Sequence, residues 1–474
     1  MKNVIWTACV GAVALGMTVS ADTVEPNQRV QWLTSVTEGY YNDPANWTGG
    51  IVPPGDSGLY GYINFQANDV TIKAPPGGLE ESSGVMFLGC GAGTHTLTID
   101  TRGSYWAKTN VTAVSDWWGT PFASSMSGQH VFNFEGLTRG GATPYVWRFE
   151  DALFTWESTG TTLQNYDLRS GTFEIAKHLY LGSTGGNVNF YIHPDATFRS
   201  AANVWDGSAY LEQRGNATTH TWFLGGEHTL NGIELKDLNS GPTTTYLHVT
   251  NDASVTLRYN MRVAARGAGS NHDGLSRATV DISENASLTV GGAVSLGTIS
   301  DGYLSSYANL RNRGDLAMSG NARLTAARLN IGHAQCSTGV LAVADSAVLT
   351  TSGTCTLGCY SNAWGRLALT DNAQATVGGV LHVAGGDMAN CGTYGELVME
   401  DDAALSVSPV NGNWVCLGSH SGAGSVARFT AKGRSRLTAS VATSVEMGYG
   451  FDADLEFALQ DEAVAEFPGG YVTN

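Results

Sequence analysis

The chain has 474 residues, of which 60 are glycine and only 14% are charged, and its formal net charge at pH 7 is −17. Nucleic acids and anionic membrane surfaces bind dense clusters of Lys and Arg, so this acidic composition excludes both as partners. Abundant Gly, Ala, Thr, Ser, Asn and Val suit many short strands joined by tight turns and suit packed helices poorly.

Residues 1–21 have the features of a secretory signal peptide. Met1-Lys2-Asn3 gives a short positive start, an apolar stretch runs to Met17, and Val19-Ser20-Ala21 ends it with small residues. We expect cleavage after Ala21 and a secreted or cell-surface product. No later segment reaches the roughly 18 to 20 apolar residues of a spanning helix, so we expect no membrane span in the mature chain.

Residues 22–80 are rich in Trp, Pro and Gly. They include Trp32, Asp43-Pro44-Ala45-Asn46-Trp47 and Pro53-Pro54-Gly55-Asp56. Because an open sheet edge invites pairing with other chains, we predict that this segment is an N-terminal cap with the tryptophans as its small core. The alternative is that Trp32, Trp47 and nearby tyrosines form an exposed platform on which sugars stack.

An internal repeat follows, and it is clearest over residues 245–474. Its anchor is a small residue after a polar turn, and successive anchors lie 25 to 36 residues apart: Ala253, Ala286, Ala322, Ala347, Ala373, Ala403, Ser435 and Ala463. An apolar pair lies six and four residues before each anchor, as Leu367 and Leu369 do before Ala373. A second alternating pair that ends in Gly follows most anchors, as in Leu329, Ile331 and Gly332.

Apolar residues at every second position indicate strands with one buried face. A unit with about three such strands is too small to enclose its own core and must stack on its neighbours. We therefore predict an all-β fold, a parallel right-handed β-solenoid over residues 81–474. A set of β-sandwiches is the alternative, although sandwich strands do not normally repeat one apolar spacing in register. Only eleven residues follow Ala463, so we expect the last coil to be incomplete or capped by a partner.

The Asp43-Pro44-Ala45-Asn46-Trp47 segment, the Gly-Gly and Pro after it, and the Asp-x-Ala-x-Leu-Thr-Val-Gly-Gly type of repeat resemble a known family. This family comprises exported bacterial proteins with autotransporter-associated β-strand repeats, common in planctomycetes and verrucomicrobia. The resemblance implies a surface-exposed solenoid and supplies no catalytic residue. Many such proteins end in a membrane barrel or a sorting signal, whereas this chain ends at Asn474.

Parallel β-helices also include polysaccharide lyases and hydrolases, whose sites use carboxylates, Arg or Lys on one outer face. The most polar candidate segment comprises Arg258, Arg262, Arg266, His272, Asp273 and Arg277. A solvated loop with ordinary charge is the simpler explanation. We therefore assign no catalytic, cofactor-binding or metal-binding residue from the sequence, and the histidines show no metal-site spacing.

Four aspartates, Asp345, Asp371, Asp401 and Asp461, lie two residues before an anchor. We expect their carboxylates to accept hydrogen bonds from backbone N–H groups two residues further on, a structural role. A stacked row of aspartates is also compatible with Ca²⁺, but one carboxylate per coil provides few ligands.

Six cysteines follow the signal peptide. By parity, Cys355 faces inward and Cys416 outward, and Cys336, Cys359 and Cys391 share one corner of consecutive coils. A disulfide from Cys359 to Cys336 or Cys391 is one expectation, and free buried thiols are the other.

The sequence as a whole favours a non-catalytic, exported structural or adhesive solenoid. Its expected partners are surface polysaccharide or other envelope proteins. The alternative is a carbohydrate-active β-helix that binds or cleaves polysaccharide.

Overall fold

The computed structural model of the chain describes most of the region from residue 29 to residue 473. The described ranges are 29–52, 60–64, 68–77, 79–81, 84–89, 94–100, 106–108, 122–126, 129–135, 146–149, 152–154, 163–175, 179–181, 187–200, 210–214, 218–237, 243–266, 276–298, 312–385, 392–408, 414–418, 424–440, 444–447, 454–467 and 472–473. The predicted signal peptide lies outside them. Within these ranges no helix is long and apolar enough to cross a membrane.

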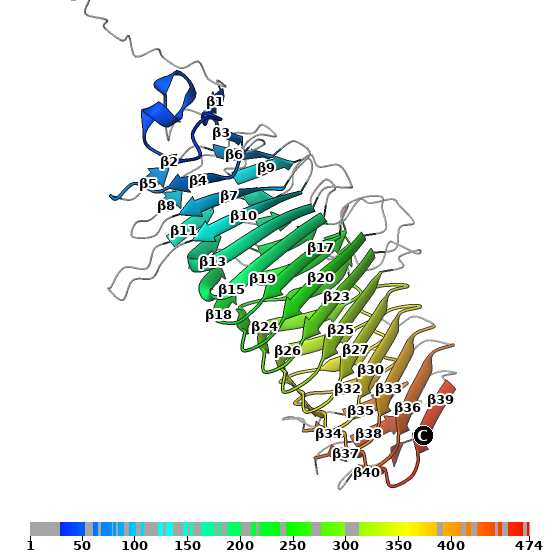
Figure 1. Cartoon of the computed structure of the whole chain (residues 1–474). Coiled ribbons are helices and arrows are strands. Elements are labelled where there is room, and N and C mark those ends of the chain that lie inside the picture. Colours follow the sequence, from blue (N-terminus) through cyan, green and yellow to red (C-terminus); the bar gives the residue numbers. More distant parts are fainter. Residues whose placement is uncertain are drawn as a thin grey trace, which may run out of the picture.

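The fold is a parallel β-solenoid, as predicted, in which the strands form three series stacked along one axis (Figure 1). The first series contains β2 (Glu38–Tyr40), β4 (Val70–Lys73), β7 (Thr94–Asp100), β10 (Gln129–Glu135), β13 (Leu163–Ile175), β15 (Asn187–Ser200), β17 (Thr219–Phe223), β20 (Thr243–Val249), β23 (Ser276–Ile282), β25 (Arg313–Met318), β27 (Thr338–Val343), β30 (Trp364–Leu369), β33 (Tyr394–Met399), β36 (Val426–Ala431) and β39 (Asp454–Leu459).

The second series begins with β11 (Val146–Phe149), which pairs with the C-terminal half of β13, and that half pairs with the C-terminal half of β15. It continues with β18 (Glu227–Leu230), β21 (Ser254–Leu257), β24 (Ser287–Leu296), β26 (Arg323–Ile331), β28 (Val348–Thr351), β31 (Gln374–Val377), β34 (Ala404–Val407), β37 (Arg436–Ala439) and β40 (Val464–Glu466). Two short strands, β5 (Leu79–Glu81) and β8 (Trp106–Lys108), form a separate parallel pair.

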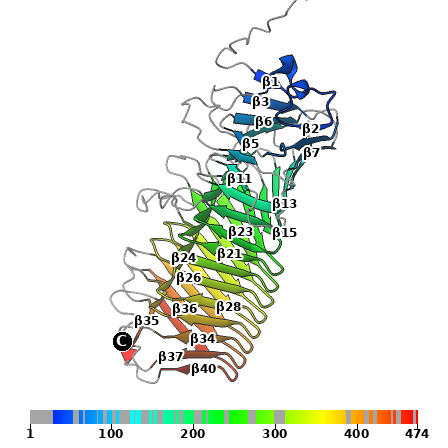
Figure 2. The same ribbon diagram turned by 90° about the vertical axis from the view of Figure 1, so that its left-hand side faces the viewer.

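The third series contains β1 (Arg29–Gln31), β3 (Tyr60–Asn64), β6 (Gly84–Gly89), β9 (Phe122–Met126), β12 (Ala152–Phe154), β14 (Leu179–Leu181), β16 (Tyr210–Arg214), β19 (Gly232–Asp237) and β22 (Met261–Arg266). The C-terminal halves of β24 and β26 continue it, followed by β29 (Cys355–Leu357), β32 (Leu381–Val383), β35 (Trp414–Leu417), β38 (Ser444–Met447) and β41 (Val472–Thr473). Figure 2 shows the stack after a quarter turn.

Inward side chains at the same repeat position form columns. Leu367, Leu397 and Phe429 pair on neighbouring strands, and all three are buried. This confirms that the repeated apolar offsets fill one shared interior. The anchors before the last coil are buried too: Ala253, Ala286, Ala322, Ala347, Ala373, Ala403 and Ser435. The inward side chains of β39 are more exposed: Phe457 is 37% and Leu459 is 45% exposed. No later strand in the described ranges pairs with β39, so no following coil covers them.

The turn before each anchor holds one residue in the left-handed region, two positions before the anchor. The residues with this positive φ are Asn251, Glu284, Gly320, Asp345, Asp371, Asp401, Gly433 and Asp461. Gly, Asn and Asp tolerate this backbone conformation best, which accounts for the row of aspartates.

The expected hydrogen-bond partners were wrong for three of the four turn aspartates, Asp345, Asp371 and Asp461. The Asp345 carboxylate accepts from the N–H of Gly320 at 2.8 Å, and the Asp371 carboxylate accepts from the N–H of Asp345 at 3.3 Å. Each partner occupies the same turn position in the preceding coil, because stacking brings that position closer than local chain folding does. The structural role holds, but it links neighbouring coils.

The segment after β1 contains two short 3-10 helices, η1 (Pro44–Asn46) and η2 (Thr48–Gly50). Trp32 and Trp47 form an antiparallel bridge, their rings meet edge to face at 5.3 Å, and both are fully buried. The alternative of an exposed sugar-stacking platform at these tryptophans is therefore wrong. Parallel pairing already includes β1 and β2, so it begins within the 22–80 segment.

A column of glycines marks where the first series passes close to the end of the third. Gly339, Gly365 and Gly395 pair in register on successive strands. A Cβ on Gly365 would lie 2.2 Å from the carbonyl oxygen of Ile331 and 2.3 Å from the amide nitrogen of Gly358. Backbone atoms rather than mobile side chains fill this space, so no larger residue fits without moving a coil.

We expect Gly365→Ala to destabilise the protein by about 1–3 kcal/mol, the usual cost of overpacking a closed interior. Urea unfolding followed by circular dichroism measures the change. Gly77→Ala is the matched control, because a Cβ at Gly77 meets no atom within 4 Å. An equal loss of unfolding free energy in Gly365→Ala and Gly77→Ala would contradict the packing explanation.

Candidate functional site

The most distinctive surface in the described residues is the outward face of the first series between β13 and β23. Two neighbouring columns of side chains run across it. One column contains Asn165, Asn189, His220, Tyr246 and Thr279. The other contains Asp167, Tyr191, Trp222, His248 and Asp281. We call the five aromatic and histidine rings of these columns, Tyr191, His220, Trp222, Tyr246 and His248, the ring cluster.

Members of the ring cluster lie face to face. The Tyr191 and Trp222 ring centres are 4.5 Å apart, and those of His220 and Tyr246 are 4.3 Å apart. Trp222 also lies 4.9 Å from His220 and 5.0 Å from His248, and in these four contacts the ring planes deviate from parallel by 15° or less. The parallel ladder imposes this arrangement, because residues at one position in successive coils are only about 4.8 Å apart.

The two histidines meet edge to edge. His220 Nδ1 lies 3.4 Å from His248 Nε2, the ring centres are 5.7 Å apart, and the planes differ by 5°. The distance between the ring centres, 5.7 Å, nearly equals the 3.4 Å between the two nitrogens plus the distance from each nitrogen to its own ring centre. Both nitrogens therefore lie near the line between the ring centres. The rings thus share nearly one plane, with one nitrogen of each facing the other. On its far side, His248 Nδ1 lies 3.5 Å from Asp281 Oδ2.

The electrostatics of the cluster follow from its partial burial. Burial lowers the pKa of His220 to about 4, and the neighbouring His248 lowers it further in the same direction. Burial, with a smaller contribution from the Asp167 carboxylate, raises the pKa of the Tyr191 phenol above its usual value. At neutral pH both rings are therefore uncharged.

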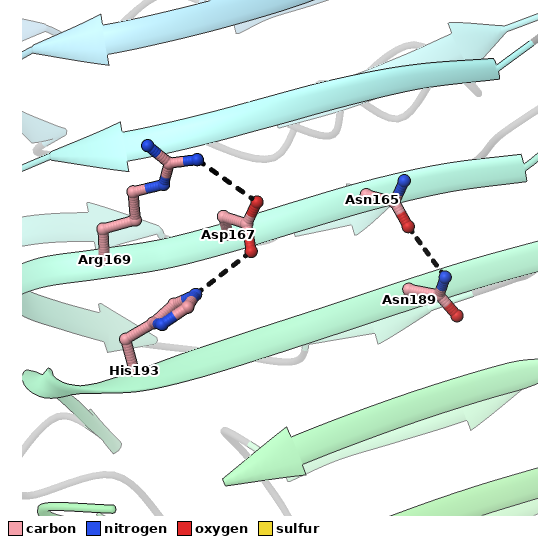
Figure 3. A network of polar contacts seen from close by, with 5 residues as sticks. All are labelled: Asn165, Asp167, Arg169, Asn189 and His193. Atoms are coloured by element: carbon pink, nitrogen blue, oxygen red, sulfur yellow. Dashed lines mark hydrogen bonds and ion pairs between the residues drawn. The ribbon is translucent and has the colours of Figure 1, made fainter. Parts of the chain in front are cut away.

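A polar network adjoins the cluster on β13 and β15 (Figure 3). The Asn189 amide donates to the Asn165 side-chain oxygen at 2.7 Å. Asp167 lies between His193, at 3.2 Å, and Arg169, at 3.8 Å. Each of these polar groups is satisfied by a neighbour on its own or the adjacent strand, so the network fixes side chains at the edge of the ring cluster.

This geometry limits the chemistry of the face. The rings cover one another's faces, so little flat aromatic surface is left for a sugar ring to stack on. Asp167 and Asp281 lie four strands apart, about 19 Å at the usual strand spacing. The carboxylates of a glycosidase pair lie about 5–9.5 Å apart. These two aspartates therefore do not form such a pair.

Beyond Asp281 the character of the face changes. The Asp281 column continues with small or apolar residues, Ala317, Ala342, Ala368 and Val398. The neighbouring column becomes a row of ion pairs, Arg366 with Glu396 and Arg428 with Glu456, each at 3.3 Å. Exposed ion pairs of this kind each contribute at most about 1 kcal/mol to folding stability. On this part of the face the named charged side chains are neutralised by their neighbours on the adjacent strands.

The polar segment singled out from the sequence does not come together as one site. Arg258 donates to the Asn231 side chain at 3.0 Å, and Arg262 forms an ion pair with the buried Glu234. Arg277 lies exposed on β23, in a different series from Arg262 on β22. The backbone of Arg266 ends β22, whereas His272 and Asp273 lie outside the described residues.

The cysteines divide as follows. Cys355 is buried as predicted, and burial raises its pKa to about 12. Cys359 is also a buried free thiol, which agrees with the expectation of free thiols and not with a disulfide from Cys359, whereas Cys391 lies outside the described residues. Cys416 was expected to face solvent, yet it is only 2% exposed. The alternation of side chains along β35 places Cys416 on the outward face of the strand, but other parts of the chain cover that face at Cys416.

Among the described residues, no group of three or more His, Cys, Asp or Glu side chains is placed to hold a metal ion. Three of the four turn aspartates considered above for Ca²⁺, Asp345, Asp371 and Asp461, use a carboxylate oxygen to accept a hydrogen bond from a backbone N–H group of a neighbouring coil.

Comparison of the chain with protein-family models, with curated proteins and with solved structures found no match. The structure itself shows the parallel β-solenoid. Because no family model matches, the resemblance to autotransporter-associated repeats stays an expectation from the sequence.

Sequence reasoning missed the ring cluster. His220 and His248 are 28 residues apart, and no local motif joins them. The available signal was the repeat itself: Trp222 precedes Phe223 and His248 precedes Val249, and both apolar residues are inward positions of consecutive coils. Aligning outward positions as well as inward ones would have placed these rings in neighbouring columns.

A buried histidine lies close behind this face. His228 Nδ1 accepts from the Phe198 N–H at 3.2 Å, and Nε2 donates to the Gly225 carbonyl at 2.7 Å. Burial lowers its pKa from 6.5 to about 4, against a smaller opposing effect of the Gly225 hydrogen bond. A proton on Nδ1 would break the bond from Phe198.

We expect His228 to make the fold less stable in mild acid. Between pH 6.5 and about 4 the unfolded chain binds a proton that the folded state excludes, so stability is complete above pH 6.5 and falls through this window. His228→Asn should lose less stability over the same window. Urea unfolding of both proteins across the pH range measures this, and parallel profiles would contradict it.

Proposed function

We propose that the chain is an exported, non-catalytic structural or adhesive β-solenoid of the cell envelope or extracellular surface. The observation that carries the proposal is the continuous apolar interior beneath a long parallel ladder. A repeat of this kind gives an extended, regular body whose outward columns serve as contact surface.

The outer face between β25 and β36 supports a structural or adhesive role. Its outward residues are small, as at Ala317 and Ala342, or are neutralised by ion pairs, as Arg366 is by Glu396. In the described part of this face the acidic and basic side chains named here pair with one another, which favours a regular contact surface for a partner over a catalytic groove. The resemblance to autotransporter-associated repeats and the predicted signal peptide of residues 1–21 favour display outside the cell.

Polysaccharide binding or cleavage is the second candidate. It is favoured by the half-buried aromatic rings of Tyr191, Trp222 and Tyr246, which share the outer face with Asp167 and Asp281. Hydrogen bonds from ring edges and carboxylates would hold the glycan, since the ring faces cover one another.

Export can be tested by expressing the full chain in a bacterium and measuring the intact mass of the product. We expect the mature protein to begin at Asp22 and to be recovered outside the cytoplasm. Replacing the small residue, as in Ala21→Arg, should block cleavage and retain the leader. A product that keeps residues 1–21 in the unaltered chain would contradict the proposal.

The two functional candidates differ in two assays on the mature protein. We expect binding to envelope fractions of the producing organism, with no release of reducing ends from a panel of polysaccharides. Trp222→Ala should leave envelope binding unchanged if the long regular face carries it. Reducing-end release, or glycan-array binding that Trp222→Ala abolishes, would favour the second candidate.

A further inference from the structure

His220 and His248 lie close enough to bind one metal ion between them. Their facing nitrogens are 3.4 Å apart, so the hydrogen bond between them is long and weak. Two nitrogens bound to one tetrahedral ion at about 2.0–2.1 Å lie about 3.3–3.4 Å from each other. The pair therefore has the separation that a shared ion requires. Because each nitrogen points at the other along the line between the ring centres, each imidazole must rotate within its plane by about 35° to direct its lone pair at a tetrahedral ion.

We propose that His220 Nδ1 and His248 Nε2 together bind one transition-metal ion of the class that prefers imidazole, such as Cu²⁺ or Zn²⁺. Within the described residues no third His, Cys, Asp or Glu completes the set, so water supplies the other ligands and the ion stays exchangeable. The site goes beyond the proposed structural role.

The ring cluster holds these ligands in place before the ion arrives. Trp222 lies parallel to both imidazoles at 4.9 Å and 5.0 Å, and Tyr246 lies parallel to His220 at 4.3 Å. A rotation within the ring plane keeps each imidazole parallel to these neighbours, so the rings lose little freedom when they bind and less of the binding energy is spent on ordering them.

Asp281 fits the role of the carboxylate that orients a metal-bound histidine. Its Oδ2 atom lies 3.5 Å from His248 Nδ1, and a carboxylate there favours the tautomer with the proton on Nδ1 and a lone pair on Nε2 for the ion. In the absence of metal, the N–H of His220 Nδ1 then donates to His248 Nε2. Metal binding requires this proton to move, through water, to His220 Nε2, so His220 changes tautomer and the pair releases no net proton.

The test is titration of the mature protein, without a polyhistidine tag, with CuCl₂ and separately with ZnCl₂, followed by calorimetry and by dialysis with metal analysis. We expect a saturable site that His220 and His248 form together, with Cu²⁺ bound more tightly than Zn²⁺. The Cu²⁺ electron paramagnetic resonance spectrum should show coupling to imidazole nitrogen.

His220→Asn and His248→Asn should each abolish this site, and the double variant should behave as either single one does. Asp281→Asn should weaken binding by about tenfold or more while leaving both ligands in place. His193→Asn is the matched control, because His193 lies on the same sheet but pairs with Asp167. It should bind as the unaltered chain does.

Thermal unfolding checks that each variant folds, and the Asp281→Asn measurement still tests the site if a histidine variant does not. Absence of saturable binding in the unaltered chain would overturn the proposal. So would affinity that stays the same in His220→Asn and His248→Asn, or that falls as much in His193→Asn.

Discussion

The hydrogen-bond ladder between successive coils constrains every other feature of this protein. Each strand pairs in parallel with the strand one coil before and one coil after, so residues at one repeat position lie about 4.8 Å apart along one axis. Inward, this spacing packs Leu367 on Leu397 and Leu397 on Phe429. In the turns, the same spacing brings the Asp345 carboxylate to the N–H of Gly320.

The same constraint acts on the outer surface, where it brings together side chains that are distant in sequence. His220 and His248 come from different coils, and so do Tyr191 and Trp222, yet their rings are in contact. The surface is therefore best described by columns, each with its own chemistry: rings and polar groups near β17, and alanines or ion pairs beyond β25. A change at one position alters the environment of the residues above and below it.

The interior was predictable from the sequence because burial repeats with a fixed offset. Anchors such as Ala373 and apolar pairs such as Leu367 and Leu369 are buried as expected. The outer face was less predictable, since outward residues obey no apolar rule and their contacts depend on rotamers and on neighbours a coil away. Hence the ring cluster was missed, and the hydrogen-bond partners of the turn aspartates were assigned to the wrong coil. Cys416 shows a related limit, because parity assigns a face but not what covers it.

The variable repeat length has a consequence for the evolution of such a chain. Anchors are separated by 25 to 36 residues while most paired strands keep their register, with a bulge in β24 as one exception, so most of the extra residues lie between strands and leave the ladder intact. Duplicating one coil would lengthen the molecule by a single strand spacing and would reproduce the contacts that its neighbours already make. Gene duplication can therefore adjust how far such a protein reaches without requiring a new core.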